Sequence, residues 1–502
     1  MRTTEIETAL TQVKSSSGAF VKTKLMSRTM KKTIRPKQNF PFTCGSAVVL
    51  AITASVFAQE KPYTLPGTGQ PASPAPAPAA KPKPSAPASA RPAETGTFNS
   101  FFSTELPDAI GKSKLSINSR LRWEQADQDG PGAADLKESD ALTLRTRFGL
   151  TTGSLYGFQG MLEGENVLSV IDSDNYNAAG SNGQPGRTVI ADPETTELNQ
   201  AWLSYSSTNL NLTLKGGRQR IVLDNHRFVG DVGWRQNMQT FDAASLEVKP
   251  VKDLSAYYGY VWEVNRVFGD VSGLPAINQD FESDSHLMNV AYSGWKYGRF
   301  VGYSYLLDLE NSAPASLGNS TATYGGYFAG TAPVEGNVNL AYRGEFAWQT
   351  DYGKSPLAYD AEYWNVELGA TVKKFALGGG YELFGSDNGQ GFKTSLATLH
   401  AFNGWADVFL NTPAAGLQDI YGFAQYTLPW QMPLRFVYHK FDADTGGGDF
   451  GQEFDVQLSK KLGKHWTALA KYAFYDGKDA APPSFASPID MQKFWLQLEF
   501  TY

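Results

Sequence analysis

The sequence is poor in the residue types that most catalytic and metal sites use: it has one cysteine, Cys44, and five histidines. A single cysteine excludes a disulfide framework and a cysteine-based zinc cluster. No apolar run reaches the roughly eighteen residues that a transmembrane helix needs, which excludes a helical bundle in the membrane. The histidines accompany no recognisable nucleophile or phosphate-binding motif. The sequence therefore predicts no enzyme, no catalytic residue, no metal site and no cofactor.

Positive charge is also scarce outside the N-terminal segment. The formal net charge is −6, but residues 1–58 carry nine lysines and arginines against two glutamates, so residues 59–502 carry −13. A protein of this balance is not a basic nucleic-acid binder. Aromatic residues are abundant instead, at 13% of the chain, and there are 49 glycines.

The longest apolar stretch, Cys44–Ala58, follows a basic segment and ends in small residues. This order is typical of a secretory signal, which we predict over residues 1–58. Its basic region is long, so translation could begin at Met26 or Met30. A short membrane anchor is the alternative, but fifteen helical residues span only about 22 Å.

Residues 59–97 are rich in proline and alanine and carry few charges. Such a segment cannot bury a core, and we expect an extended periplasmic tether. The folded part is then predicted over residues 98–502.

Apolar and polar residues alternate along most of the folded part, as in strands with one apolar and one polar face. The final segment shows the pattern clearly, because Phe494, Leu496 and Leu498 alternate with Lys493, Trp495 and Gln497. We predict eighteen strands, at residues 115–124, 142–150, 155–166, 196–205, 210–219, 243–249, 254–264, 285–293, 298–308, 321–330, 337–349, 358–371, 375–384, 418–428, 434–442, 453–460, 465–475 and 491–502.

The connections between these strands alternate between short and long. Tight periplasmic turns and longer extracellular loops are typical of a transmembrane antiparallel β-barrel, here of eighteen strands, in a Gram-negative outer membrane. Aromatic residues near the strand ends suit contact with membrane lipid and lipopolysaccharide, and the terminal Tyr502 resembles the signal that the barrel-assembly machinery reads. A large soluble β-sandwich is the alternative fold.

The polar face of a barrel lines its lumen, so the charges on that face are the candidate functional residues. Four arginines stand on the first two strands, and two glutamates stand on the third; further pairs lie on later strands. The arginines are Arg120, Arg122, Arg145, Arg147, Arg343 and Arg435, and their candidate counter-charges are Glu163, Glu165 and Glu345. These residues form either a network of salt bridges that stiffens the wall or a positive constriction that favours anions.

Two segments depart from the simple pattern. Arg218 and Arg220 would face lipid if alternation continued, unless a bulge at Gly216-Gly217 turns them inward or they lie above the hydrocarbon. In loop 385–417, apolar residues from Leu396 to Phe409 recur at helical spacing, which predicts a short amphipathic helix in a long loop. We expect this loop to fold inward; the alternative is that it caps the rim of the barrel.

Two unusual stretches resemble the alginate export family of outer-membrane proteins. The first runs from Gly217-Arg218-Gln219-Arg220 through Arg227-Phe228 and Gly233-Trp234-Arg235-Gln236-Asn237 to Asp242-Ala243, and the second from Leu396 to Asp407 and on to Asp419. The resemblance implies an eighteen-stranded barrel with an arginine-rich lumen that passes an anionic polysaccharide. It adds Arg218, Arg220, Arg227 and Arg235 to the candidate pore residues.

Taken together, we predict a passive channel for anionic solutes, with an anionic polysaccharide such as alginate or a related uronate polymer as the favoured solute. The alternative is a general porin that prefers small anions.

Overall fold

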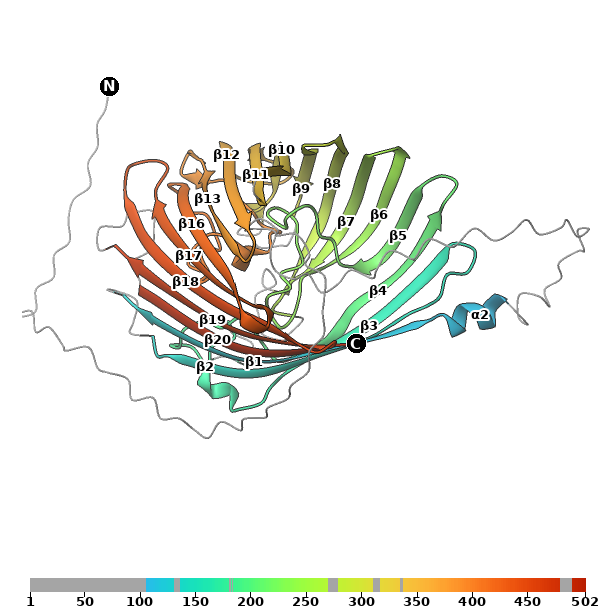
Figure 1. Cartoon of the computed structure of the whole chain (residues 1–502), viewed down its shortest axis with the longest axis horizontal. Coiled ribbons are helices and arrows are strands. Elements are labelled where there is room, and N and C mark those ends of the chain that lie inside the picture. Colours follow the sequence, from blue (N-terminus) through green and yellow to red (C-terminus); the bar gives the residue numbers. More distant parts are fainter. Residues whose placement is uncertain are drawn as a thin grey trace, which may run out of the picture. The chain divides into compact units, whose positions relative to one another are not determined.

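The computed structural model describes residues 105–130, 136–179, 182, 184–269, 279–309, 317–334, 337–478 and 490–502. The predicted signal and tether, residues 1–97, lie outside the described residues. Figure 1 shows that the described part is a curved wall of strands, with the C-terminus beside the first strands.

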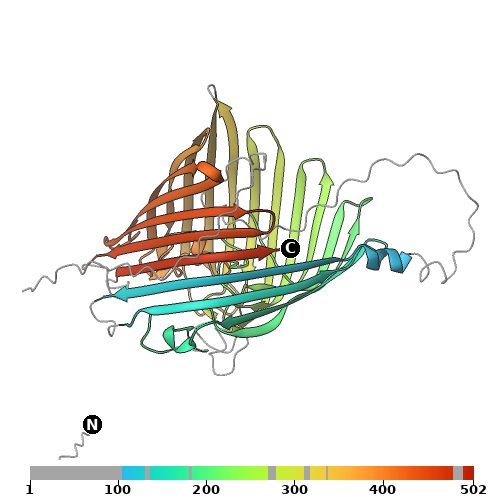
Figure 2. The ribbon, with the colours of Figure 1, turned by 60° about the horizontal axis from the view of Figure 1, so that its bottom comes forward.

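Eighteen antiparallel strands close into one barrel, as predicted. The first strand pairs with the second and also with the last, Asn118 lying opposite Thr501, so the sheet has no free edge. Figure 2 shows the last strand beside the first. The strands are β1 Lys114–Asp129, β2 Ser139–Thr151, β3 Phe158–Ser169, β4 Thr195–Ser207, β5 Leu212–Gln219, β6 Thr240–Val251, β7 Leu254–Asn265, β8 Asp280–Trp295, β9 Gly298–Leu307, β10 Thr321–Val334, β11 Val338–Asp351, β12 Asp360–Val372, β13 Phe375–Phe384, β16 Leu417–Leu428, β17 Met432–Asp442, β18 Asp449–Leu462, β19 Trp466–Gly477 and β20 Asp490–Thr501.

Side chains alternate between two environments along each strand. On β12, Trp364, Val366 and Leu368 are exposed, whereas Asn365 and Glu367 are buried. This is the reverse of a soluble protein, in which exposed residues are polar. The outer surface is therefore an apolar band suited to lipid, and the polar residues face the lumen.

Short turns gather at one end of the barrel and long loops at the other. The short-turn end also holds the helix α2, Leu106–Gly111, whose Ala109 carbonyl accepts a hydrogen bond from the Gly153 amide at 3.1 Å. Among the described residues, no helix is long and apolar enough to cross a membrane.

The prediction of an amphipathic helix in loop 385–417 is wrong. This loop contains a two-residue hairpin, β14 Ser386–Asp387 with β15 Gln390–Gly391, and a single 3-10 turn, η3 Leu399–Ala401. Asn403, Gly404 and Asp407 all take positive φ angles, which no helix accommodates. The barrel supplies a partner for the loop backbone, because the Ala406 amide donates to Glu453, and Phe409 packs against Phe441 and Phe450 of the wall.

Candidate pore constriction

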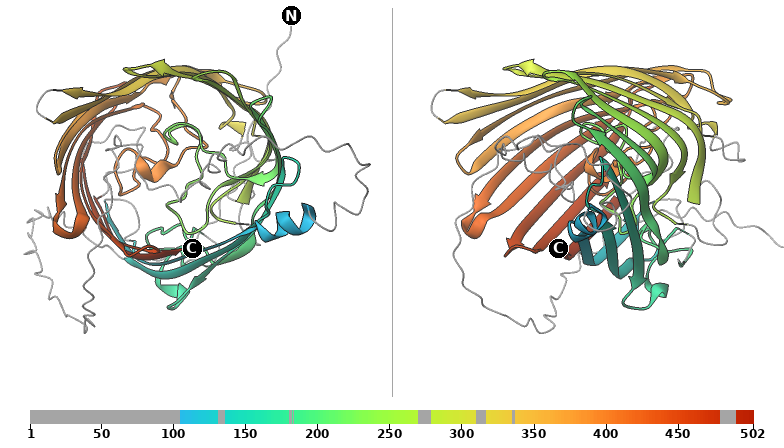
Figure 3. Two further views of the ribbon diagram at one scale, coloured as in Figure 1. Left: turned by 45° about the vertical axis from the view of Figure 1, so that its right-hand side comes forward. Right: turned by 90° about the vertical axis from the view of Figure 1, so that its right-hand side faces the viewer.

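Two loops from the long-loop end lie within the ring of strands, as the left panel of Figure 3 shows. They are residues 220–239, between β5 and β6, and residues 385–416, between β13 and β16, and we refer to them as the inner loops. The loops are joined to each other by a parallel bridge between Val229 and Leu396. The Gln239 side chain reinforces this junction, because its amide donates to the Leu396 carbonyl at 3.2 Å.

The four arginines of β1 and β2 face the lumen, and three of them hold the first inner loop by its backbone. Arg120 donates to the Trp234 carbonyl at 3.0 Å, and Arg147 donates to the Gln236 carbonyl at 3.2 Å. Arg145 reaches the same Gln236 carbonyl at 3.5 Å. All three arginines are nearly or fully buried. Carbonyl groups of a buried loop need donors, and the guanidinium groups supply them.

Arg122 contacts the same loop through a side chain. Its guanidinium carbon lies 4.0 Å from the centre of the Trp234 ring. The group also donates to the Gln497 side chain at 2.8 Å and lies 3.6 Å from a carboxylate oxygen of Asp192. Asp192 belongs to the loop between β3 and β4 and accepts a hydrogen bond from the Gln236 amide at 2.8 Å. A third loop thus supports the first inner loop.

The predicted counter-charges take different partners. Glu165 pairs with Arg147, as expected from their positions on neighbouring strands. Glu163 accepts hydrogen bonds from the amide side chains of Asn199 and Gln200 instead, at 2.7 and 2.8 Å. We call Arg120, Arg122, Arg145 and Arg147 the arginine ladder. Their charges are therefore balanced mainly by other carboxylates.

Glu499 on β20 is the carboxylate that the ladder shares. One of its oxygens lies 3.4 Å from Arg120 and 3.2 Å from Arg145, and it also accepts from Asn118 at 2.9 Å. The closure of the barrel between β1 and β20 brings these residues together, although Glu499 is 354 to 381 positions from its partners in the sequence. Sequence periodicity places Glu499 on the inward face but does not reveal its partners.

The arginines of the first inner loop are also paired. Arg227 binds both carboxylate oxygens of Glu382, at 2.9 and 3.2 Å, and donates to the Asn403 side chain at 2.6 Å. Its guanidinium group lies over the rings of Phe384 and Phe402. Such bidentate geometry fixes the position of a guanidinium group. Arg227 therefore links the two inner loops to the barrel wall.

Arg235 makes a second link of the same kind. It donates to both carboxylate oxygens of Glu124 on β1, at 3.2 and 3.1 Å. It also donates to Asp407 of the second inner loop at 2.9 Å. Arg220, the first residue of the loop, pairs with Asp231. The predicted loop arginines therefore act within the loop network, and Asp407 is a residue that sequence reasoning missed as a site.

Asp407 is the centre of a buried polar cluster. It accepts hydrogen bonds from Lys493 at 3.0 Å and from the Nδ1 atom of His400 at 2.6 Å. Lys471 in turn donates to the His400 Nε2 atom at 2.7 Å. This arrangement suits a neutral His400 whose proton is on Nδ1. The Trp234 ring stacks on the imidazole at 4.2 Å, so both inner loops contribute to the cluster.

The cluster shifts the pKa values of its two loop residues. Burial, together with the nearby Lys471 ammonium, lowers the pKa of His400 well below its usual value, although Asp407 acts in the opposite direction. For Asp407, burial acts to raise the pKa, but His400, Lys493 and Arg235 outweigh it and hold that pKa well below its usual value. Asp407 is therefore ionised and His400 neutral at pH 7.

Two further predicted arginines lie deeper in the barrel. Arg343 binds Glu345 through two nitrogens, at 2.9 and 2.6 Å, and its guanidinium carbon lies 3.8 Å from the centre of the Tyr327 ring. Arg435 lies over the Phe423 ring at 4.9 Å. Both arginines line the same internal cavity.

The prediction that Arg218 lines the pore is wrong. Pairing of β5 with β4 is unbroken at Gly216-Gly217, so Arg218 stays on the outward row with Leu212 and Leu214. Arg218 lies at the long-loop end of β5 and binds Asp242 on β6, with distances of 2.7 and 3.0 Å. An ion pair at the strand end avoids the cost of placing a charge in hydrocarbon.

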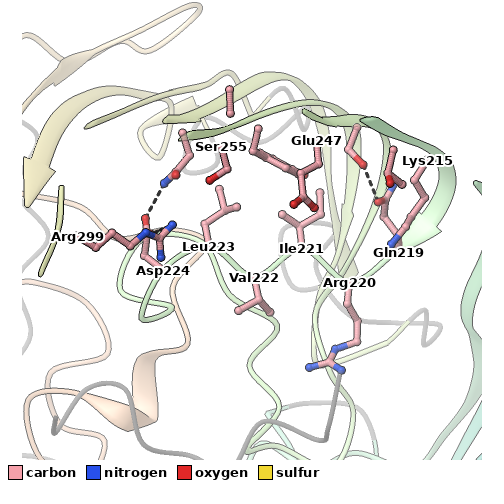
Figure 4. Close-up of a pocket in the computed structure, with 15 residues that line it drawn as sticks. Lys215, Gln219, Arg220, Ile221, Val222, Leu223, Asp224, Glu247, Ser255 and Arg299 are labelled. Atoms are coloured by element: carbon pink, nitrogen blue, oxygen red, sulfur yellow. Dashed lines mark hydrogen bonds and ion pairs between the residues drawn. The ribbon is translucent and has the colours of Figure 1, made fainter. Parts of the chain in front are cut away.

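Two cavities lie between the inner loops and the short-turn end. The large cavity, of about 540 Å³, reaches from the inner loops to the β16–β17 turn and the end of β18. The small cavity, of about 380 Å³, lies against β5 to β9 and is lined by polar residues that include Lys215, Arg220 and Arg299. Figure 4 shows the ion pair between Arg299 and Asp224 at one side of the small cavity.

Comparison with known proteins agrees with this architecture. Residues 114–381, more than half of the chain, match the family described as alginate export. No curated protein sequence matches the chain.

Solved structures share the fold. The crystal structure of OccK9 (OpdG) from Pseudomonas aeruginosa has a TM-score of 0.60 at 15% identity, covering 78% of this chain and 100% of that chain. OpdK from Pseudomonas aeruginosa, solved with vanillate, has a TM-score of 0.59 at 12% identity, covering 78% of this chain and 99% of that chain. A BenF-like porin from Pseudomonas fluorescens Pf-5 has a TM-score of 0.59 at 13% identity, covering 78% of this chain and 100% of that chain. The chain therefore belongs to the alginate export family and is a β-barrel channel of the Gram-negative outer membrane.

Proposed function

We propose that this channel passes anionic, sugar-type solutes by passive diffusion, and that its natural solute is an anionic polysaccharide such as alginate or a related uronate polymer. The lining of the large cavity carries this proposal. Its charged residues are six basic, Arg120, Arg343, Arg435, Lys460, Lys461 and Lys471, and four acidic, Glu367, Glu382, Asp419 and Glu499.

Three of the four acidic residues in this lining already have partners, two of them arginines and one a histidine. Glu499 is shared by Arg120 and Arg145, Glu382 is held by Arg227, and Asp419 lies 2.9 Å from His439. Lys460 and Lys461 stand near the cavity mouth, and within the described residues neither has a carboxylate oxygen within 4.0 Å. A mouth that carries this positive excess attracts anions and repels cations.

The remaining lining suits carbohydrate. Amide side chains, among them Asn365, Asn403 and Gln425, offer donors and acceptors for hydroxyl groups, and the rings of Phe402 and Trp405 offer flat apolar surfaces. The volume of about 540 Å³ falls within the range of about 300–1,000 Å³ that is usual for sites of small ligands. The cavity is therefore large enough for a short segment of a sugar chain.

In this proposal the arginine ladder has a positioning role. Arg120, Arg145 and Arg147 donate their hydrogen bonds to carbonyls of the first inner loop and to carboxylates. The ladder thus fixes the constriction, and the cavity beneath it supplies the selectivity. The sequence allowed two interpretations, a stabilising network and a positive site that favours anions. In this proposal the arginine ladder is the network, and the basic residues of the large cavity are the positive site.

A general porin for small anions is the second candidate function. The observation that favours it is the number of buried contacts that fix the inner loops, Arg227 and Arg235 among them, because a fixed constriction suits small solutes better than a polymer.

Block of single-channel current by oligouronates separates these candidates. For a polysaccharide channel we expect block that strengthens with oligomer length and is absent with neutral oligosaccharides of equal length. Indifference to oligouronates of every length would contradict the polysaccharide proposal and favour the general porin.

A further inference from the structure

The turn between β16 and β17 presents a tryptophan at the mouth of the large cavity. Trp430 lies in the 3-10 turn η4, Pro429–Gln431, and is 79% exposed. The other exposed tryptophans of the barrel are 41–45% exposed. Trp430 and Gln431 both line the large cavity, so this turn forms part of its rim.

The backbone of this turn is strained. Trp430 has φ 60° and ψ 25°, and Gln431 has φ 57°, which places two consecutive residues with side chains in the left-handed region. That region is unfavourable for a residue other than glycine, because the β-carbon comes too close to the following carbonyl oxygen. Glycine or asparagine would form the turn at lower cost. Backbone strain clusters at functional sites, so the positive φ of Trp430 directs attention to its indole ring.

The neighbours of Trp430 complete a recognisable arrangement. The Lys460 ammonium lies 5.6 Å from the centre of the indole ring, and Lys461 lines the same cavity from the same strand end. Deeper in the cavity, Phe402 and Trp405 offer further rings toward the inner loops. The rim therefore combines a flat apolar face with two positive charges.

We infer that Trp430, Lys460 and Lys461 form a periplasmic binding subsite for an acidic sugar residue of the transported chain. The apolar C–H face of a pyranose ring stacks on the indole, and the sugar carboxylate binds the Lys461 ammonium, which continues the inward row of β18. The Lys460 ammonium, over the indole ring, adds positive charge beside it. This inference rests on the proposed function and adds to it the place where the chain first binds. Binding at the rim concentrates the anionic chain beside the constriction and orients it along the cavity.

A tryptophan at a membrane interface can also serve as a lipid anchor. Trp466, at the same end of the barrel, provides the matched comparison. It is 44% exposed and pairs with Phe500 on the outward row, so it faces lipid. If Trp430 is a sugar subsite, replacing it should weaken oligouronate block, whereas replacing Trp466 should not. If both residues are lipid anchors, the two replacements should have the same effect on block.

The test measures oligouronate block of single channels in planar bilayers, with the oligomer added to each side in turn. We expect block from the periplasmic side to weaken on the order of tenfold in Trp430→Ala, to survive largely in Trp430→Phe, and to be unchanged in Trp466→Ala. Lys460→Ser combined with Lys461→Ser should weaken block further.

Trp430→Gly guards against a folding artefact. Glycine relieves the backbone strain, so this variant should unfold at no lower temperature than Trp430→Ala while its block stays weak. If oligouronates block the wild type, and block Trp430→Ala and Trp430→Gly equally well, the subsite is wrong but the proposed function stands. A wild-type channel that oligouronates do not block from either side would overturn both.

Discussion

Gly404 lies where the second inner loop packs against the barrel wall. Its φ is +83°, and a β-carbon added there would lie 2.2 Å from a carboxylate oxygen of Glu453. That carboxylate also accepts a hydrogen bond from the Ala406 amide at 2.7 Å. The absence of a side chain at Gly404 thus allows the loop to dock on β18.

Gly404→Ala should loosen the second inner loop. The substitution imposes a left-handed alanine and a steric clash, so we expect amide hydrogen exchange over residues 399–409 to speed up by roughly tenfold or more. Gly446→Ala is the matched control, because Gly446 has a similar φ of +79° but open space around it. Equal acceleration in the two variants would show that the close approach to Glu453 has no effect.

His400 gives the docked loop a pH dependence. Because its pKa is lowered in the folded protein, the undocked state binds more protons below the ordinary histidine pKa of about 6.5. Docking is therefore complete above that pH and weakens as pH falls through it, by at most about tenfold per pH unit. Asp407, whose pKa is also lowered, adds a second loss only below its ordinary value of about 3.9.

Hydrogen exchange over residues 399–409 as a function of pH, corrected for intrinsic rates, checks this expectation. Protection should fall between pH 7 and pH 5 in the wild type and stay nearly constant in His400→Gln, whose amide can contact both Asp407 and Lys471. A wild-type profile that is flat over this range would contradict a neutral His400.

At the scale of elements, β1 and β2 hold the first inner loop, and β16 to β18 form the mouth of the large cavity. Arg120 on β1 donates to the carbonyls of Gly233 and Trp234, whereas Lys460 and Lys461 end β18. These two sets of basic residues are predicted to serve the constriction and the selectivity, respectively.

Two variants separate these roles. Arg120→Ser leaves Glu499 paired with Arg145, so we expect faster hydrogen exchange at residues 233–236 and noisier current, with little change in ion selectivity. Lys460→Ser with Lys461→Ser should reduce anion preference and leave that exchange unchanged. If Arg120→Ser instead reduced anion preference and the double lysine variant did not, the arginine ladder would be the selectivity filter.

At the scale of the whole molecule, the strands were predictable because a barrel wall has lipid on one side and the lumen on the other. Apolar and polar residues therefore alternate with a two-residue period along each strand. Arg120 and Glu499 could be placed on the inward face for this reason. The pairing of Glu499 with Arg120 and Arg145 was not predictable, because it arises only when β20 closes against β1.

The errors also have physical causes. Arg218 continues the outward row because its charge is neutralised by Asp242 beyond the apolar band, a contact that periodicity does not include. The spacing of Leu396, Leu399 and Phe402 resembles a helix, but Asn403 and Gly404 turn the chain, and the barrel wall satisfies its backbone. The role of Asp407 depends on groups from β20 and from both inner loops.

The charge of the chain as a whole is a poor guide to the pore. Residues 59–502 sum to −13, yet the lining of the large cavity has more basic than acidic residues. A barrel separates its surface charge from its lumen charge, so a net acidic protein can favour anions.

The reversal potential of the wild-type channel in a planar bilayer, under a gradient of potassium chloride, tests this central claim most directly. The account predicts a potential of the sign that chloride selectivity produces, shrinking toward zero in the Lys460→Ser, Lys461→Ser variant. A wild-type reversal potential of the opposite sign, showing preference for potassium, would contradict it.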